Sequence, residues 1–226
     1  MPRMTRIAAA LALAVALSAV ALAQELPQED PAAEEALAQA LSAVNGASFH
    51  FVYSIWPVQE ANSPVTGEGD LDRGSQSFRY TVSTDAQDET ADHGNDGEWI
   101  LAEGVMYHDA GAGWQPGDRD LTYMSITSMI APFESYPFAK MLGSPEDGNL
   151  DLLALAGTDE VDGVQAAHYR FATKEIEMLG TATYEVWIAG DPAAPTLVVL
   201  QSTDEAGQVS RVTYSAIGED VTITAP

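Results

Sequence analysis

The sequence predicts an α+β domain built on one antiparallel sheet, with helices on one face. Two patterns support this class: short segments in which large apolar residues alternate with polar ones, and an N-terminal segment with apolar residues every three or four positions. Alternation with a period of two is typical of strands that bury one face. Asp-Gly and Glu-Gly dipeptides between such segments are typical of hairpin turns. No internal repeat or low-complexity tract divides the chain.

The first predicted element is an amphipathic helix at 34–44, which Asn45-Gly46 ends. Its apolar residues follow a helical spacing after an acidic first turn: Ala36, Leu37, Ala40, Leu41 and Val44. A strand with large apolar residues on one face follows at 49–56, and Pro57 ends it. Further strands of a meander are predicted at 65–73, 77–84, 98–103 and 105–108.

The middle of the chain, from Leu121 to Leu155, predicts short helices that prolines interrupt. The apolar residues that support these helices are Tyr123, Ile126, Met129, Ile130, Phe133, Leu150, Leu152, Leu153 and Leu155. The interrupting prolines are Pro132, Pro137 and Pro145. Strands are predicted again at 165–172, 181–189, 196–202, 209–215 and 221–224, with a hairpin turn at Asp204-Glu205-Ala206-Gly207.

The first 23 residues have the order of a cleavable secretory signal peptide. Arg3 and Arg6 precede an apolar run from Ile7 to Leu17, and Ala21-Leu22-Ala23 supplies small residues before a cleavage site. The alternative is a retained membrane helix, but the run is shorter than the roughly 20 residues that cross a bilayer. We therefore expect a signal peptide at 1–23 and a single domain at 24–226, exported to the periplasm or the extracellular space, with no membrane anchor after cleavage.

The composition excludes several classes of partner. The net charge is −25, and removal of the two signal arginines leaves −27. Nucleic acids and anionic membrane surfaces bind through clustered Lys and Arg, so we expect neither as a partner. The acidity is typical of a solubilising surface. The chain contains no cysteine, which excludes disulfides and the lipid-modified cysteine of a bacterial lipoprotein.

Several segments, taken in order, resemble the lipoprotein-carrier superfamily of LolA/LolB-like half-barrels, which includes LppX/LprG-type lipid carriers. The segments are the Ala/Leu helix running into Ser48-Phe49-His50-Phe51, Gly67-Glu68-Gly69-Asp70-Leu71, Asp96-Gly97-Glu98-Trp99, Val105-Met106-Tyr107, Gly113-Trp114, Val161-Asp162-Gly163-Val164, His168-Tyr169-Arg170-Phe171 and Tyr184-Glu185-Val186-Trp187-Ile188. The resemblance implies an unclosed half-barrel of about eleven strands, with helices inserted on its concave face and an apolar cavity for acyl chains. Because the cysteine of lipid-anchored relatives is missing, a freely diffusing carrier is implied.

Large side chains on one face of the predicted sheet, together with the central helices, are the candidate cavity lining. The ten candidates are Phe49, Phe51, Tyr53, Phe78, Tyr80, Ile126, Met129, Ile130, Phe133 and Phe138. Apolar periodicity reports burial and not a void, so an ordinary filled core is the alternative. The segment 132–138, with aromatics between prolines, fits either a flap over the cavity mouth or a structured connection.

No pattern in the chain predicts catalysis, a cofactor or a metal. The four histidines form no HxxxH pair, and no serine lies in a Gly-x-Ser-x-Gly turn. The oxygen-rich stretch 85–98 lacks the spacing of a calcium-binding EF-hand loop and is interpreted as a solvated acidic loop, with Ca²⁺ binding as the alternative. We expect a monomeric, non-enzymatic lipid carrier or sensor. The alternatives are a module with a filled core that binds an envelope protein, and a cell-envelope hydrolase.

Overall fold

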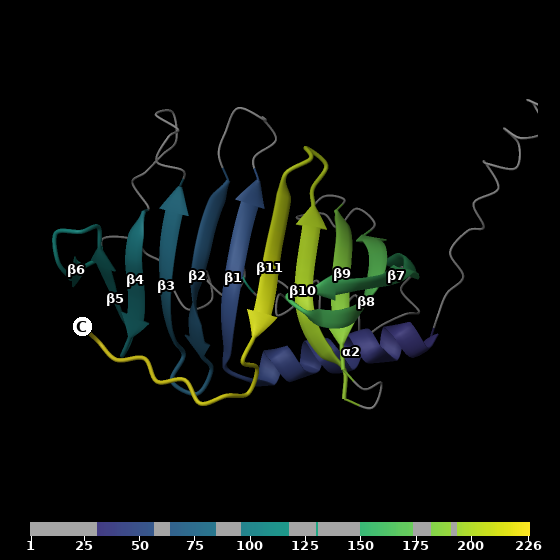
Figure 1. The fold of residues 1–226 in the computed structure, drawn as a ribbon. Coiled ribbons are helices and arrows are strands. Elements are labelled where there is room, and N and C mark those ends of the chain that lie inside the picture. Colours follow the sequence, from purple (N-terminus) through teal and green to yellow (C-terminus); the bar gives the residue numbers. More distant parts are fainter. Residues whose placement is uncertain are drawn as a thin grey trace, which may run out of the picture.

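The structure, a computed structural model, describes residues 31–56, 64–84, 96–117, 130, 150–173, 182–190 and 194–226. In these residues eleven strands form one antiparallel sheet in the order β6-β5-β4-β3-β2-β1-β11-β10-β9-β8-β7 (Figure 1). The strands are β1 (Phe49–Trp56), β2 (Val65–Asp72), β3 (Ser77–Thr84), β4 (Gly97–Ala102), β5 (Val105–Asp109), β6 (Gln115–Pro116), β7 (Leu150–Val161), β8 (Val164–Thr173), β9 (Thr183–Ala189), β10 (Thr196–Thr203) and β11 (Val209–Ser215). The sheet is not closed, since β6 and β7 are its two edges. The predicted α+β half-barrel is confirmed.

Helix α2 (Pro31–Gly46) covers one end of the sheet and packs against β10, β9 and β7 (Figure 1). Proline is favoured in the first helical turn because its missing N–H has no helical partner there. The residues at three- and four-residue spacing are buried, namely Leu37, Ala40, Leu41 and Val44. The predicted helix is therefore confirmed, and it begins three residues before the predicted position.

Alternation in the strands separates two faces of the sheet. On β1, Phe49, Phe51 and Tyr53 are buried, whereas Val52 between them is 40% exposed. The buried side chains join the apolar side of α2 in one hydrophobic cluster. We call this side the concave face and the opposite side the convex face. Cross-strand register extends the concave face to both neighbours of β1, because Phe51 lies opposite Tyr214 of β11 and Gly69 of β2.

Two predicted elements are wrong. Residues Leu150–Leu155 were predicted to be helical, but they begin the edge strand β7, which pairs with β8. Leucine and alanine are good helix formers, but intrinsic helix propensity is a small free energy per residue, and pairing with β8 overrides it here. The predicted strand at 221–224 does not form. Its apolar residues are half-buried, yet β1 already pairs with β2 and β11, so this segment has no free strand edge beside β1.

The chain after β11 instead runs past the lower ends of the neighbouring strands (Figure 1). The Gly218 amide donates to the Ser48 carbonyl over 2.9 Å, which ties this segment to the start of β1. The two-residue strand β6 was not predicted at all. The predicted central helices at 121–142 lie outside the described residues, except for Ile130, which is helical.

Candidate functional site

The predicted lining residues that the structure describes all lie in the concave-face cluster. They are Phe49, Phe51, Tyr53, Phe78, Tyr80 and Ile130, each at most 5% exposed. The other four candidates lie outside the described residues: Ile126, Met129, Phe133 and Phe138. Sequence reasoning therefore placed the described candidates on a common surface. Their role as the lining of a cavity stays a prediction.

Aromatic rings form a nearly continuous surface across the centre of this face. The Phe49 ring meets Tyr214 of β11 edge-on at 5.4 Å between centroids and meets Phe51 at 6.3 Å. The ring of Phe51 in turn stacks on Tyr53 at 6.3 Å. On β3 the Phe78 ring lies 5.4 Å from that of Tyr80. Offset and edge-on pairs of this kind are favourable arrangements for aromatic side chains.

Two glycines of β2 lie where neighbouring strands leave no room for a side chain. A Cβ atom at Gly67 would lie 2.0 Å from Cε1 of the Tyr53 ring, and one at Gly69 would lie 2.1 Å from the backbone carbonyl oxygen of Arg79 in β3. Both distances are far below van der Waals contact, so neither position accepts a side chain without movement. Sequence reasoning noted two glycines in this strand but missed their role. The available signal was their spacing of two, which places both on the face that carries the aromatics.

One contact brings the central region onto the concave face. The hydroxyl of Tyr214 donates a hydrogen bond to the backbone carbonyl of Ile130. The Ile130 side chain is fully buried within the same apolar cluster. At this described point, the middle of the chain lies over the aromatic surface of β1 and β11.

The concave face carries no formal charge on β1–β5 or β8–β11. Register places the charged residues of these strands on the convex face, including Asp70 opposite Arg79 and Arg170 opposite Glu185. Arg79 is ion-paired there with Glu98. An ionised group buried against the concave face would therefore find no counter-charge on these strands.

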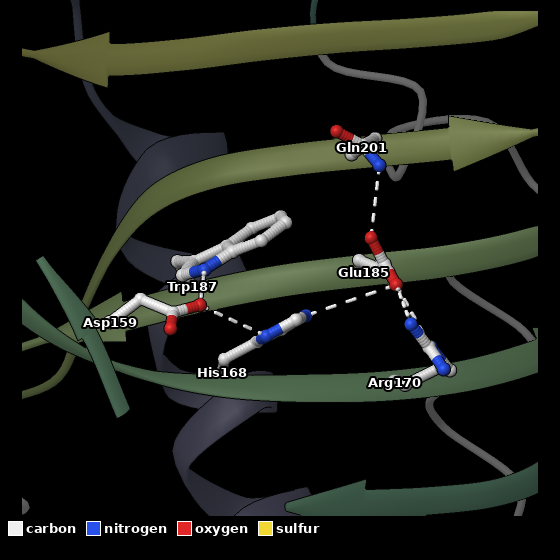
Figure 2. Close-up of polar contacts among 6 residues, drawn as sticks. All are labelled: Asp159, His168, Arg170, Glu185, Trp187 and Gln201. Carbon is white, nitrogen blue, oxygen red and sulfur yellow. Dashed lines mark hydrogen bonds and ion pairs between the residues drawn. The ribbon is translucent and has the colours of Figure 1, made fainter. Parts of the chain in front are cut away.

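A polar and aromatic cluster occupies the convex face of β7–β11 (Figure 2). Trp187 Nε1 donates to Asp159 Oδ2 over 2.8 Å, and His168 Nδ1 lies 3.1 Å from the same oxygen. The His168 ring stacks on the Trp187 ring at 4.2 Å. We call these three residues the convex cluster. It joins three neighbouring strands, because Asp159 lies on β7, His168 on β8 and Trp187 on β9.

Further charges border the convex cluster (Figure 2). Glu185 is ion-paired with Arg170 and accepts a hydrogen bond from Gln201 Nε2 over 2.9 Å. Nε2 of His168 is buried without a hydrogen bond, 4.0 Å from Glu185 Oε1. The Arg211 guanidinium carbon lies 5.2 Å from the centroid of the Trp187 ring. The sequence analysis found no HxxxH pair among the four histidines, and it did not predict this arrangement around His168.

The acidic stretch 85–98 is described only from Asp96 onward. There the Asp96 carboxylate accepts from the Thr84 amide at 3.0 Å and the Thr84 hydroxyl at 2.8 Å, which ties the start of β4 to the end of β3. Within the described part of the chain, no group of three or more metal-ligating side chains is found. Among the helical residues that the structure describes, none forms a helix long and apolar enough to span a membrane.

Comparison with known proteins identifies the fold. No protein-family model matches the sequence, and no curated protein matches it. The structure is similar to lipoprotein LppX of Mycobacterium tuberculosis, with a TM-score of 0.61 and 14% identity, covering 87% of this chain and all of that one. It is also similar to LprF of Mycobacterium bovis, with a TM-score of 0.62 and 17% identity, covering 88% and 98%. The chain therefore has the LppX-like half-barrel fold that its segments resemble.

Proposed function

We propose that this chain is an exported, non-enzymatic protein that binds a lipid or another amphiphile against the concave face of its half-barrel, as a carrier or a sensor. The observation that carries the proposal is the aromatic, uncharged surface spread over an unclosed sheet. Removing apolar surface from water contributes about 25 cal/mol per Å², or about 0.8 kcal/mol for each buried methylene. The affinity for an acyl chain on this surface would therefore rise with the number of methylenes that the chain buries.

The ten lining candidates named from the sequence form the proposed contact surface, with the central helices predicted at 121–142 as its cover. The position of Ile130 under the Tyr214 hydroxyl supports a cover that reaches the concave face. The signal-like first 23 residues support function in the periplasm or outside the cell. The lack of cysteine supports a carrier that diffuses freely after export.

Native mass spectrometry of the protein purified from its own cell envelope tests the proposal. We expect a lipid-sized adduct that delipidation removes. A module with a filled core would carry no adduct and would take up no added lipid. That result would overturn lipid binding and favour a protein-binding role for the same scaffold.

One substitution on the concave face of β3 and one on the convex face of β1 test which face binds the ligand. Phe78→Trp adds bulk to the concave face, so we expect weaker uptake of a fluorescent diacylglycerol. Val52→Trp adds more bulk on the convex face of β1, where the side chain is 40% exposed, and serves as the matched control. Equal uptake by the wild type and both variants would exclude Phe78 from the lining.

A further inference from the structure

The His168 imidazole lies between two carboxylates that come from the strands on either side of it. Its Nδ1 atom is 3.1 Å from Oδ2 of Asp159 on β7, and its Nε2 atom is 4.0 Å from Oε1 of Glu185 on β9 (Figure 2). Within the described part of the chain, Nε2 is buried and has no hydrogen-bond partner. A buried polar atom left unpaired destabilises the fold, so the position of Nε2 beside a carboxylate needs a physical reason.

The neutral ring can satisfy only one of the two carboxylates. It carries a single proton, and the shorter contact places that proton on Nδ1, which donates it to Asp159. The lone pair of Nε2 then faces the negative Glu185 oxygen with no hydrogen between them. Protonation adds an N–H at Nε2, which can shorten the 4.0 Å contact to a charge-assisted hydrogen bond of about 2.8 Å. The protonated ring therefore bridges β7 and β9 through β8.

The other charged and polar groups around the imidazole do not oppose this proton strongly. Arg170 of β8 is ion-paired with Glu185, but its side chain is 59% exposed, so solvent screens its charge. Arg211 of β11 lies against the Trp187 ring, 5.2 Å from its centroid, and Gln201 of β10 is neutral. Both carboxylates lie next to the imidazole itself, and the net charge of −25 attracts a proton from a longer range.

A second histidine on the convex face gives a comparison. His50 of β1 has Nδ1 2.9 Å from Asp70 and Nε2 3.5 Å from Glu68, and both carboxylates lie on β2. Its side chain is 29% exposed, against 15% for His168, and the Glu68 side chain is 69% exposed. Solvent therefore screens the charges around His50. His168 is more buried, and it joins an edge strand to the sheet.

We propose that His168 is a proton-operated latch for the edge strand β7. With a proton on both nitrogens, the ring ties Asp159 of β7 to Glu185 of β9; with one proton, it ties Asp159 to β8 alone. The latch is strongest in acid and weakens as pH rises through the range in which histidine loses its proton, between about pH 5 and 8. Among the described strands β7 pairs only with β8, so side-chain contacts of this kind control its opening. The latch does not depend on the lipid-binding function proposed above.

Native-state hydrogen exchange of β7 amides in the full chain tests the latch at pH 5.5 and pH 8. Each rate is divided by the intrinsic exchange rate at the same pH to give a protection factor. His168→Phe keeps a ring beside Trp187 but binds no proton. We expect the gain in β7 protection from pH 8 to pH 5.5 to be about tenfold larger in the wild type than in this variant, as one charge-assisted hydrogen bond requires. Glu185→Gln, which removes the charge that receives the Nε2 proton, should behave like His168→Phe.

His50→Gln is the matched control, because it removes the histidine that lies between two carboxylates in the middle of the sheet. It should keep the wild-type gain in β7 protection. Nitrogen NMR of the His168 ring gives an independent measurement, with a proton on both nitrogens at pH 5.5 and on Nδ1 alone at pH 8. A ring that stays neutral at pH 5.5, or a gain in His168→Phe as large as in the wild type, would overturn the latch.

Discussion

At Gly67 the chain omits a side chain because the Tyr53 ring occupies the space where one would stand. A Cβ atom there would lie 2.0 Å from Cε1 and 2.4 Å from Cζ of that ring. We expect Gly67→Ala to lower the free energy of unfolding by about 1–3 kcal/mol, because the buried ring must move away from its neighbours. Urea unfolding of wild type and variant at one pH measures the difference.

Gly46 provides the control for this substitution. It ends α2, and a Cβ atom there meets nothing within 4 Å, so Gly46→Ala should leave stability almost unchanged. In a Tyr53→Ala background the cost of Gly67→Ala should shrink, because the clashing ring is gone. Equal costs in both backgrounds would show that the Tyr53 ring is not the cause.

The Asp72 carboxylate makes the stability of the turn between β2 and β3 depend on pH. Its carboxylate accepts from the Ser75 hydroxyl at 2.6 Å and the Gly74 amide at 2.9 Å. These bonds, the Ser75 hydroxyl first, lower the pKa of Asp72 below its usual value. The folded state therefore binds this proton less readily than the unfolded state. The resulting stability is fully present above the unfolded carboxyl pKa of about 3.9 and is lost as pH falls through the lower folded value.

The corresponding variant is Asp72→Asn. We expect it to destabilise the protein at pH 7 by no more than about 1 kcal/mol, since solvent screens this surface turn. The difference from the wild type should shrink as pH falls through the lowered folded pKa of Asp72, because the wild-type carboxyl then becomes neutral as well. Thermal unfolding of both proteins between pH 2.5 and 7 gives the two curves. Parallel curves over this range would contradict the assigned pKa direction.

At the scale of elements, the sequence predicts strands well where one face is buried along the whole strand. The predicted spans 49–56, 77–84 and 209–215 agree with β1, β3 and β11 residue for residue, because alternating burial matches alternating sequence. The β7 segment has leucines in a row instead of alternation, and its pairing with β8 includes two register shifts. The local pattern therefore does not reveal that it is a strand.

The difference between local alternation and cross-strand pairing also explains why the sequence predicts the concave-face residues but not the convex cluster. The described lining candidates on strands could be assigned to one face from the sequence, because the alternation of side chains along a strand is visible in each segment alone. The convex cluster depends on pairing across three strands, and Asp159 and Trp187 are 28 positions apart. Which residues meet across β7, β8 and β9 follows from register, which the composition of each strand does not fix.

The convex cluster should hold the edge strand β7 to the rest of the sheet. Asp159→Ala removes the acceptor of the Trp187 indole and the partner of His168, and Trp187→Phe removes the indole donor. We expect each substitution to cost about 1–2 kcal/mol and the pair to cost less than the sum. Hydrogen exchange should show faster opening of β7 amides in both variants.

Thr158→Ala is the control for this prediction, because Thr158 is an exposed neighbour on the same strand. It should leave exchange in β7 close to that of the wild type. Additive costs for the Asp159 and Trp187 substitutions would show that their hydrogen bond does not couple the strands.

At the scale of the whole molecule, charge is separated from the concave face. The chain carries a net charge of −25, while the concave face of β1–β5 and β8–β11 carries none. The surface must therefore hold many like charges close together. Their mutual repulsion favours the unfolded chain, in which they move apart, and salt weakens this repulsion over a Debye length of about 10 Å at 0.1 M.

The unfolding temperature should therefore rise between 0.01 and 0.2 M sodium chloride at pH 7, because screening relieves more repulsion in the compact state than in the unfolded one. The ion pairs Arg79–Glu98 and Arg170–Glu185 weaken with salt, but exposed pairs contribute only about 0–1 kcal/mol each, too little to reverse this trend. Near the sequence isoelectric point of 4.1 the net charge approaches zero, so the same salt series should have little effect there. A salt response of equal size at both pH values would show that repulsion between surface carboxylates does not limit the stability of this half-barrel.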